Sequence, residues 1–228
     1  MNLAVMQPYF FPYIGYFQLI REVDAFVIYD DVNYIKGGWI NRNYILANGN
    51  SQRVTLPLKG ASPNKLINQI EVAEGNKILQ SVRQSYGRAP HFQAAFPLIE
   101  KILSQAEKNL AYFLYYQLRL LCEYLELNPQ WYFSSKLEKD RELRGQKKIL
   151  AICEELGATC YTNLPGGKAL YDEEVFAARE IKLSFIQPQT LSYQQFDKKF
   201  ISQLSIIDML MFNDVEECKK LLSSYHVL

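Results

Sequence analysis

The first thirty residues alternate between strand-like and helix-like patterns, and this alternation restricts the folds available to the chain. Residues 3–7 (LAVMQ) are apolar and predict a short buried strand. Residues 12–23 begin with proline, which fits the first turn of a helix, and continue with a helical pattern. Residues 25–30 (AFVIYD) are rich in β-branched and aromatic side chains and predict a second strand. A strand, a short helix and a strand in this order predict a parallel βαβ unit.

The remaining chain continues the alternation of strands and helices, so the predicted class is α/β with a mostly parallel, Rossmann-like sheet. Helical patterns at 76–87, 91–105 and 109–127 follow one another without a strand between them. We therefore expect one domain over residues 1–228, with 76–127 as a helical insert or cap. Further strands are expected at 52–59, 66–72, 130–135, 158–163 and 182–187, and further helices at 142–157, 173–180, 200–213 and 215–225.

The composition of the chain limits the cellular compartments and the binding partners that we expect. The net charge of +1 gives no general attraction to nucleic acid or to acidic membrane surfaces. No stretch reaches the roughly 20 apolar residues that a membrane span needs, and no secretory signal pattern is visible. The four cysteines match neither a zinc pattern nor a CxxC pair, which favours reduced thiols in the cytoplasm. We expect a cytoplasmic protein with no nucleic-acid partner and no membrane insertion; the sequence leaves the cofactor unknown and a homo-oligomer possible.

Polar residues follow the first two predicted strands. Gln7 ends the first strand, and Asp30-Asp31 end the second. Ligands of parallel sheets bind beyond the carboxyl ends of the strands, where these side chains would lie side by side. The residues between the two strands include six aromatic side chains at 7–17, of which Tyr13 and Tyr16 are assigned to the ligand mouth. Phe10, Phe11 and Phe17 are assigned to the core.

The segment 29–45 (YDDVNYIKGGWINRNYI) is the densest collection of chemically useful side chains. Carboxylates can hold a proton or a sugar hydroxyl, and Lys and Arg side chains can hold phosphate. Tryptophan offers a flat face to a sugar or a base, and paired glycines let backbone N–H groups approach an anion. A surface loop whose charges pair with one another is the alternative. The candidates are Asp30, Asp31, Lys36, Gly37, Gly38, Trp39, Asn41, Arg42 and Asn43.

Two later strand ends repeat the pattern. Ser134 and Ser135 end one strand, and a glycine-containing turn follows another. The candidates in that turn are Asn163, Gly166, Gly167 and Tyr171. The alternative for both groups is a local one, in which the serines cap a turn and the glycines form it. His91 is first a helix-cap residue and second a base. Asp208, in an apolar helix, is expected to need a structural partner such as a backbone amide or Arg42.

Five blocks of the sequence together resemble the WbqC-like protein family. They are MQPYFFPYIGYFQLI, DDVNYIKGGWINRN, SSKL, GATCYTNLPGGKALYD and QLSIIDMLMFN, in the family's order and over nearly the whole chain. The resemblance implies a bacterial cytoplasmic protein associated with cell-surface polysaccharides such as O-antigen. It also implies the attachment of an amino-acid-derived acyl group, such as glycyl, to an amino sugar.

The opening alone is also similar to nucleotidylyltransferases with an HxGH motif, whose histidines steady the phosphates of ATP. Tyr13 and Tyr16 stand where those histidines would be, and a tyrosine carries no positive charge at neutral pH. No KMSKS-like loop is evident. The fold can be related while adenylyl chemistry is lost or altered.

Three functions follow as hypotheses. The first is a transferase that attaches an aminoacyl or acyl group to a nucleotide-linked amino sugar, with a carrier-protein thioester among the possible donors. In it, Asp30 or Asp31 accepts the amine proton, with His91 in reserve, and Lys36, Arg42 and the glycine pair hold the pyrophosphate. The second is a nucleotidylyltransferase-like or ATP-dependent ligase. The third is a non-catalytic sugar-binding protein of a biosynthetic complex.

Overall fold

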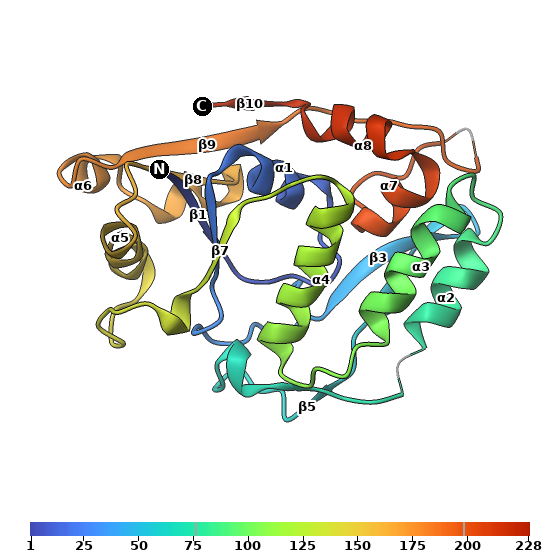
Figure 1. The fold of residues 1–228 in the computed structure, drawn as a ribbon, viewed down its shortest axis with the longest axis horizontal. Helices are drawn as coiled ribbons and strands as arrows, with labels where there is room; N and C mark the ends of the chain where they lie inside the picture. Colours follow the sequence, from blue (N-terminus) through green and yellow to red (C-terminus); the bar gives the residue numbers. More distant parts are fainter. Residues whose placement is uncertain (76, 198) are drawn as a thin grey trace.

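A six-stranded sheet organises the protein (Figure 1). The structure, a computed structural model, describes residues 1–75, 77–197 and 199–228. The strand order is β10-β9-β8-β1-β2-β7, in which only β10 runs antiparallel to its neighbour. The α/β class and the mostly parallel sheet predicted from the sequence are confirmed. The strands are β1 (Asn2–Met6), β2 (Ala25–Ile28), β7 (Gln130–Phe133), β8 (Cys160–Asn163), β9 (Lys182–Pro188) and β10 (Tyr225–Val227).

The direction in which strands are added to the sheet reverses at β1. The chain builds β1, β2 and β7 toward one edge and then returns to place β8 and β9 on the other side of β1. In open sheets of this kind, the loops at the carboxyl ends of the strands diverge at the reversal and leave room for a ligand. The expected site therefore lies beyond the carboxyl ends of β1, β2, β7, β8 and β9.

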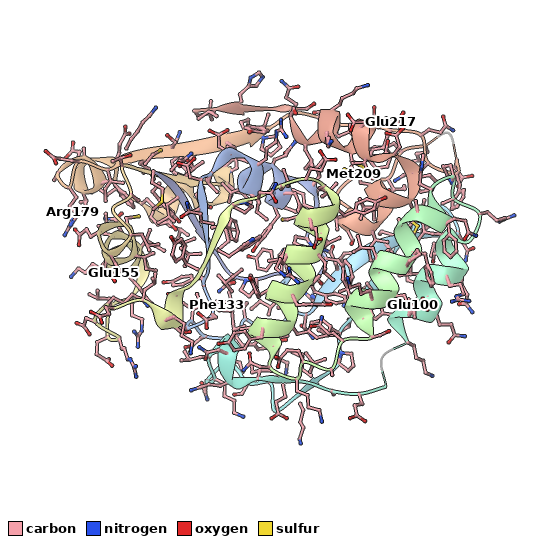
Figure 2. All side chains as sticks on the ribbon, viewed as in Figure 1. Glu100, Phe133, Glu155, Arg179, Met209 and Glu217 are labelled. Carbon is pink, nitrogen blue, oxygen red and sulfur yellow. The ribbon has the colours of Figure 1, made fainter. Side chains whose placement is uncertain are left out.

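Alternating side chains of β1 and β2 fill two separate cores. Ala4, Phe26 and Ile28 belong to the larger core, whereas Leu3 and Val27 belong to the smaller one. The larger core lies against α1, α4, α7 and α8, and the smaller one against α5 and α6 (Figures 1 and 2). Strands that are buried on both faces are expected of a parallel sheet covered by helices. The helices of these two layers are α1 (Ile14–Glu22), α4 (Leu110–Tyr124), α5 (Gly145–Glu155), α6 (Glu173–Ala177), α7 (Ile206–Phe212) and α8 (Val215–Leu222).

A long excursion separates β2 from β7, and it contains small strands as well as helices. Its elements are β3 (Arg42–Ala47), β4 (Asn50–Thr55), β5 (Leu58–Lys59), the 3₁₀ turn η1 (Ile67–Gln69), β6 (Glu71–Val72), α2 (Ile78–Tyr86), α3 (Phe92–Leu103) and α4. The division into one domain with an insert at 76–127 stays a prediction.

Strand β3 was not predicted from the sequence. It forms a hairpin with β4 around Asn48-Gly49, both with positive φ (50° and 71°). Asn-Gly is the preferred pair for this kind of turn, so the signal was present in the sequence. The expected strand 52–59 divides into β4 and β5, because Pro57 cannot donate a ladder hydrogen bond.

The C-terminal region also differs from expectation. Helix α7 begins at Ile206 rather than at residue 200, since Ser205 accepts a hydrogen bond from Ile207 N (3.2 Å) as its N-cap. Strand β10 follows, whereas the sequence predicts a helix through residue 225, the first residue of this strand, and no strand after it. Among the described helices, none has both the length and the apolar character needed to cross a membrane.

Candidate functional site

The aromatic opening forms a tight turn between β1 and α1 that two buried amide side chains hold in place. Gln117, on α4, accepts a hydrogen bond from Phe11 N and donates one to Tyr9 O, both at 3.0 Å. Asn43 donates to the carbonyl oxygens of Phe10 (3.2 Å) and Phe11 (2.7 Å). Phe11 has φ 40°, which a non-glycine residue rarely adopts. Such a conformation persists where its surroundings over-determine it, so the turn presents Tyr9 and its neighbours in a fixed position.

This turn forms one wall of a cavity of about 250 Å³. Tyr13 and Trp39 were both assigned to the ligand mouth from the sequence, and both line the cavity together with the predicted Asn43. Trp39 is 47% exposed, so its ring is available to a ligand. The lining residues are Tyr9, Pro12, Tyr13, Trp39, Asn43 and Gln203.

A second cavity, of about 300 Å³, adjoins the first at Tyr13 and Gln203, which line both. It lies between the start of α1, the carboxyl end of β9 and the segment that leads into α7. Gln203 has φ 58°, a second left-handed non-glycine residue at this junction. The polar residues of its lining are Tyr13, Gln189, Thr190, Tyr193, Ser202, Gln203 and Ser205.

Neither cavity has a charged side chain among the described residues that line it. Rings, hydroxyls and amides of this kind suit an uncharged polar ligand such as a sugar ring. Tyr13 lines both cavities, and burial and the neighbouring Tyr9 raise the pKa of its hydroxyl, which is protonated at neutral pH in any case. Gly15 is required beneath the Tyr13 ring, since a Cβ there would lie 2.5 Å from it.

Two cations lie close in sequence to the exposed ring of Trp39. Lys36 is exposed, and it forms no ion pair within the described chain. Arg42 donates from Nη2 to the carbonyl of Gly37, whereas its buried Nε has no hydrogen-bond partner among the described residues. Gly37 has φ 83°, a conformation that favours glycine. Gly38 donates to Ile35 O (3.1 Å) within the same turn. The loop can therefore supply positive charge next to the first cavity.

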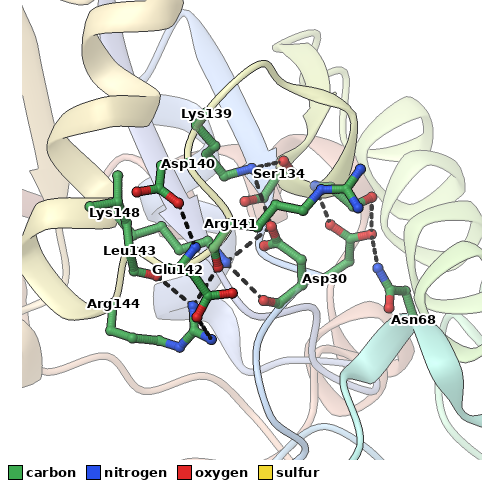
Figure 3. Close-up of polar contacts among 12 residues, drawn as sticks. Asp30, Asn68, Ser134, Lys139, Asp140, Arg141, Glu142, Leu143, Arg144 and Lys148 are labelled. Carbon is green, nitrogen blue, oxygen red and sulfur yellow. Dashed lines mark hydrogen bonds and ion pairs between the residues drawn. The ribbon is translucent and has the colours of Figure 1, made fainter.

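The carboxyl ends of β2 and β7 carry an ionic cluster, which Figure 3 shows. Asp31 Oδ2 lies 3.0 Å from Lys148 Nζ and 3.2 Å from Lys139 Nζ, and the two lysine side chains are only 3% exposed. Lys148 Nζ also donates to Asp31 O (2.8 Å). Burial raises the pKa of the Asp31 carboxyl group. The Ser134 hydroxyl and the two ammonium groups lower it by more than burial raises it, so the pKa of Asp31 lies below its ordinary value. Burial lowers the pKa of Lys148, and Asp31 opposes that shift.

Asp30 points away from this ion pair and into a separate hydrogen-bond network. Its Oδ1 accepts from Ser135 N (2.9 Å), and its Oδ2 accepts from Ser135 Oγ (2.6 Å) and Asn68 Nδ2 (3.0 Å). The carboxyl group is 2% exposed and joins the end of β7 to the excursion (Figure 3). Neither Asp30 nor Asp31 lines either cavity. The expectation that they line a mouth with Tyr13 and Trp39 is therefore corrected. Ser135 and Asn68 bond the oxygens of Asp30, and the two lysines pair with Asp31 Oδ2, whereas the buried Asp31 Oδ1 has no hydrogen-bond partner among the described residues.

The predicted residues after β8 form a third group. Asn163 Nδ2 donates to the hydroxyls of Tyr161 (3.0 Å) and Tyr171 (3.2 Å), which are themselves 3.0 Å apart. A Cβ at Gly167 would lie 3.0 Å from Asn163 Nδ2, so the glycine allows this close approach. Gly166 is exposed at the start of the 3₁₀ helix η3 (Pro165–Leu170). These residues fix the turn after β8, and they line neither cavity.

The remaining predicted residues have structural contacts. The hydroxyl of Tyr16, which is fully buried, donates to Gln7 O (2.9 Å) beneath the opening turn. Asn41 accepts from Tyr34 OH (2.8 Å) and donates to Leu56 O (2.9 Å), which uses both ends of its amide. His91 precedes α3, and its backbone donates to Met211 O (3.1 Å) on α7. The sequence assigned Tyr16 to the ligand mouth; its burial places it in the core instead.

Sequence reasoning missed residues that come from distant parts of the chain. Tyr9 was not distinguished from its aromatic neighbours, although its ring lines the first cavity. Gln117 and Lys148 lie on predicted helices, where a buried polar residue within an apolar pattern was the available signal. The residues missed at the site are Tyr9, Gln117, Lys139, Lys148, Gln189, Thr190, Ser202, Gln203 and Ser205. The described chain contains no group of three or more His, Cys, Asp or Glu residues placed to hold a metal ion.

Asp208 supports the far wall of the second cavity. It accepts from Tyr86 OH (2.9 Å), Tyr193 OH (2.7 Å) and Gln195 Nε2 (2.7 Å). The role is structural, as expected, but its partners are these three side chains and not Arg42. Burial raises the pKa of Asp208 despite the three donors, which lower it.

A pH dependence of stability follows from this raised pKa. The folded chain binds the Asp208 proton more tightly than the unfolded chain, whose carboxyl titrates near 3.8. Stability from this group therefore falls as pH rises from about 3.8 through the raised folded pKa. We expect the difference in unfolding free energy between the wild type and Asp208→Asn to decrease over that range in urea titrations. A difference that is constant with pH would contradict the assignment.

The comparisons with known proteins agree with the sequence blocks. The model of the WbqC-like protein family matches residues 7–220, which include both cavities and the ionic cluster. The chain belongs to the WbqC-like protein family. A relative of this WbqC-like protein, named Uncharacterized protein Rv1507c, comes from Mycobacterium tuberculosis (strain ATCC 25618 / H37Rv). It is 30% identical over 219 residues, which cover 92% of each chain. No solved structure matches the chain significantly.

Proposed function

We propose that this WbqC-like protein transfers an acyl or aminoacyl group to the amine of a nucleotide-linked amino sugar in bacterial surface-polysaccharide biosynthesis, such as that of O-antigen. The observation that carries the proposal is the uncharged cavity of Tyr9, Tyr13, Trp39 and Asn43 next to the Lys36–Arg42 loop. The cavity has the size and polarity for a sugar ring, and the loop provides cations for a diphosphate. Membership of the WbqC-like family supports a role in polysaccharide synthesis.

The reaction needs a neutral amine, a held acyl group and a donor to the oxyanion. Tyr13 lines both cavities, and in this scheme its protonated hydroxyl donates to the carbonyl oxygen. Asp30 and Asp31 are left out of this scheme because neither lines a cavity, and each carboxylate already has partners within the protein. An activated acyl donor, such as a carrier-protein thioester, then supplies the leaving group.

A non-catalytic sugar-binding function is the second candidate. It is supported by the lining of the two cavities, which includes no carboxylate, histidine or cysteine within the residues described. A nucleotidylyltransferase-like activity has less support, since the Tyr16 hydroxyl is buried and bonded to Gln7 O. Turnover of an acyl thioester with UDP-glucosamine separates the transferase from the non-catalytic sugar-binding protein. A strong stabilisation by ATP in thermal-shift measurements would favour the nucleotidylyltransferase-like activity.

Replacement of Trp39 by alanine tests the sugar cavity. An aromatic face contributes about 1–1.5 kcal/mol to a stacked partner, so we expect Trp39→Ala to weaken UDP-glucosamine binding roughly tenfold. Isothermal titration calorimetry measures the affinity. Trp39 is half exposed, so its loss should leave folding intact.

The matched control is Tyr112→Ala, another partly exposed aromatic residue, which lines neither cavity. We expect its affinity for UDP-glucosamine to equal that of the wild type. Equal affinity in Trp39→Ala and the wild type would contradict the sugar cavity, and no binding by the wild type would contradict the proposed function.

A further inference from the structure

The second cavity has no part in recognition of the sugar as proposed so far, yet it opens onto the same two residues. Tyr13 and Gln203 line both cavities, so two molecules bound in them would meet there. Amide formation requires such a meeting, because the sugar amine must reach the acyl carbonyl carbon. The end of β9 and the start of α7 contribute its other lining residues.

We propose that the second cavity holds the acyl group of the donor and selects acyl groups that carry no charge. This inference rests on the proposed transferase function. The amine nitrogen forms a bond to the carbonyl carbon, the bond from that carbon to the thioester sulfur breaks, and the amine proton leaves with the thiol. The step needs no oxidant or reductant.

The selection follows from the lining. Its polar groups are the hydroxyls and amides of Gln189, Thr190, Ser202 and neighbouring residues, with no carboxylate among the described ones. A glycyl group carries an ammonium ion at neutral pH, and an ammonium ion buried without an anion loses hydration. Asp208 lies behind Tyr193, and three donors already occupy its oxygens. An acetyl group or another uncharged acyl group avoids this cost.

Gln203 fits the role of a junction residue. Its side chain is exposed, its backbone lies in the left-handed region with φ 58°, and it borders both cavities. A non-glycine residue with this backbone conformation is uncommon. Tyr13 also lines both cavities and provides a hydroxyl donor for the carbonyl oxygen.

Filling the second cavity tests its assignment. Thr190 and Ser202 are exposed at the rim, so Thr190→Trp and Ser202→Trp should fold. With acetyl-pantetheine thioester as donor and UDP-glucosamine as acceptor, we expect each variant to raise the donor KM at least tenfold. The Kd for UDP-glucosamine should stay within twofold of the wild type. The control Gln80→Trp, on the exposed face of α2, should change neither constant.

A comparison of an uncharged and a charged acyl donor tests the proposed selection of uncharged acyl groups. At pH 6.5 we expect kcat/KM for acetyl-pantetheine to exceed that for glycyl-pantetheine at least tenfold. The ratio should fall as pH rises through about 8, where the glycyl ammonium loses its proton. Comparison of two donors at each pH cancels the titration of the sugar amine.

The outcomes separate the two levels of the proposal. Turnover that both tryptophan variants leave unchanged would overturn the second-cavity assignment while the transferase function stands. A glycyl donor preferred at pH 6.5 would overturn the charge selection. A wild type that binds UDP-glucosamine but turns over neither thioester would contradict the transferase function, and this inference with it.

Discussion

Asp31→Asn should lower the free energy of unfolding by about 3–5 kcal/mol, because it leaves two buried lysines without their counter-charge. Lys139 and Lys148 approach the same oxygen, Oδ2, at 3.2 and 3.0 Å, and the side chains of both lysines are 3% exposed. An asparagine keeps the size but provides no negative charge. Chemical denaturation at pH 7 measures the loss.

Two comparisons make this result specific to the ion cluster. Glu138→Gln, at an exposed position in the same segment, should change stability by less than about 0.5 kcal/mol. The double variant Asp31→Asn with Lys139→Met removes one of the stranded cations, and it should recover part of the loss. A double variant no more stable than Asp31→Asn would argue against charge as the cause.

The ionic cluster of Asp31, Lys139 and Lys148 should also affect how stability changes at acid pH. Because the pKa of Asp31 in the folded protein is below its ordinary 3.8, its pairing stabilises the protein fully above that pH. This contribution is lost as pH falls through the lowered pKa. The acid limb of the stability curve should therefore be shallower in Asp31→Asn than in the wild type.

Gln117→Leu should lower the free energy of unfolding by about 2–4 kcal/mol and also weaken UDP-glucosamine binding. The substitution leaves Phe11 N and Tyr9 O buried without partners, and each such group costs about 1–3 kcal/mol. It also releases the left-handed conformation at Phe11, which fixes the wall of the first cavity. Denaturation and calorimetry on one preparation give both effects.

Gln80→Leu provides the matched control for that variant. Gln80 is exposed on α2, so the same change of side chain there should alter stability by less than about 0.5 kcal/mol. A Gln117→Leu protein that is destabilised but binds UDP-glucosamine normally would show that the turn does not position the ligand. A protein with unchanged stability would contradict the hydrogen-bond argument itself.

Local patterns explain which parts of the fold were predictable. The strand, helix and strand at the start were found because short apolar runs and a helical pattern are visible in neighbouring residues. The helix begins at Ile14, however, so Pro12 precedes it and does not lie in its first turn. Strand β3 of the hairpin was not predicted, although the Asn48-Gly49 turn that follows it is a hairpin signal in the sequence. Boundaries shifted where a single cap decided them, as Ser205 does for α7.

The candidate site also has a part that the sequence predicts and a part that it does not. The sequence identified Tyr13, Trp39 and Asn43, because aromatic and amide residues beside strand ends are uncommon in plain loops. It also placed Asp30 and Asp31 beyond the end of β2, where both lie. The sequence could not predict whether those carboxylates have partners within the protein. Their partners Ser135, Lys139 and Lys148 lie about 100 residues or more away along the chain.

By itself, the sequence determined the α/β class, the family and the list of residues from which a site could be built. Those properties depend on local periodicity and on motifs of adjacent residues. The tertiary structure alone decided which candidates face a cavity, since the cavities form where residues 9–14, 39–43, 188–193 and 200–209 meet. Contacts with Ser135, Lys139 and Lys148 gave the two aspartates partners within the protein, whereas Tyr13 was left between two cavities.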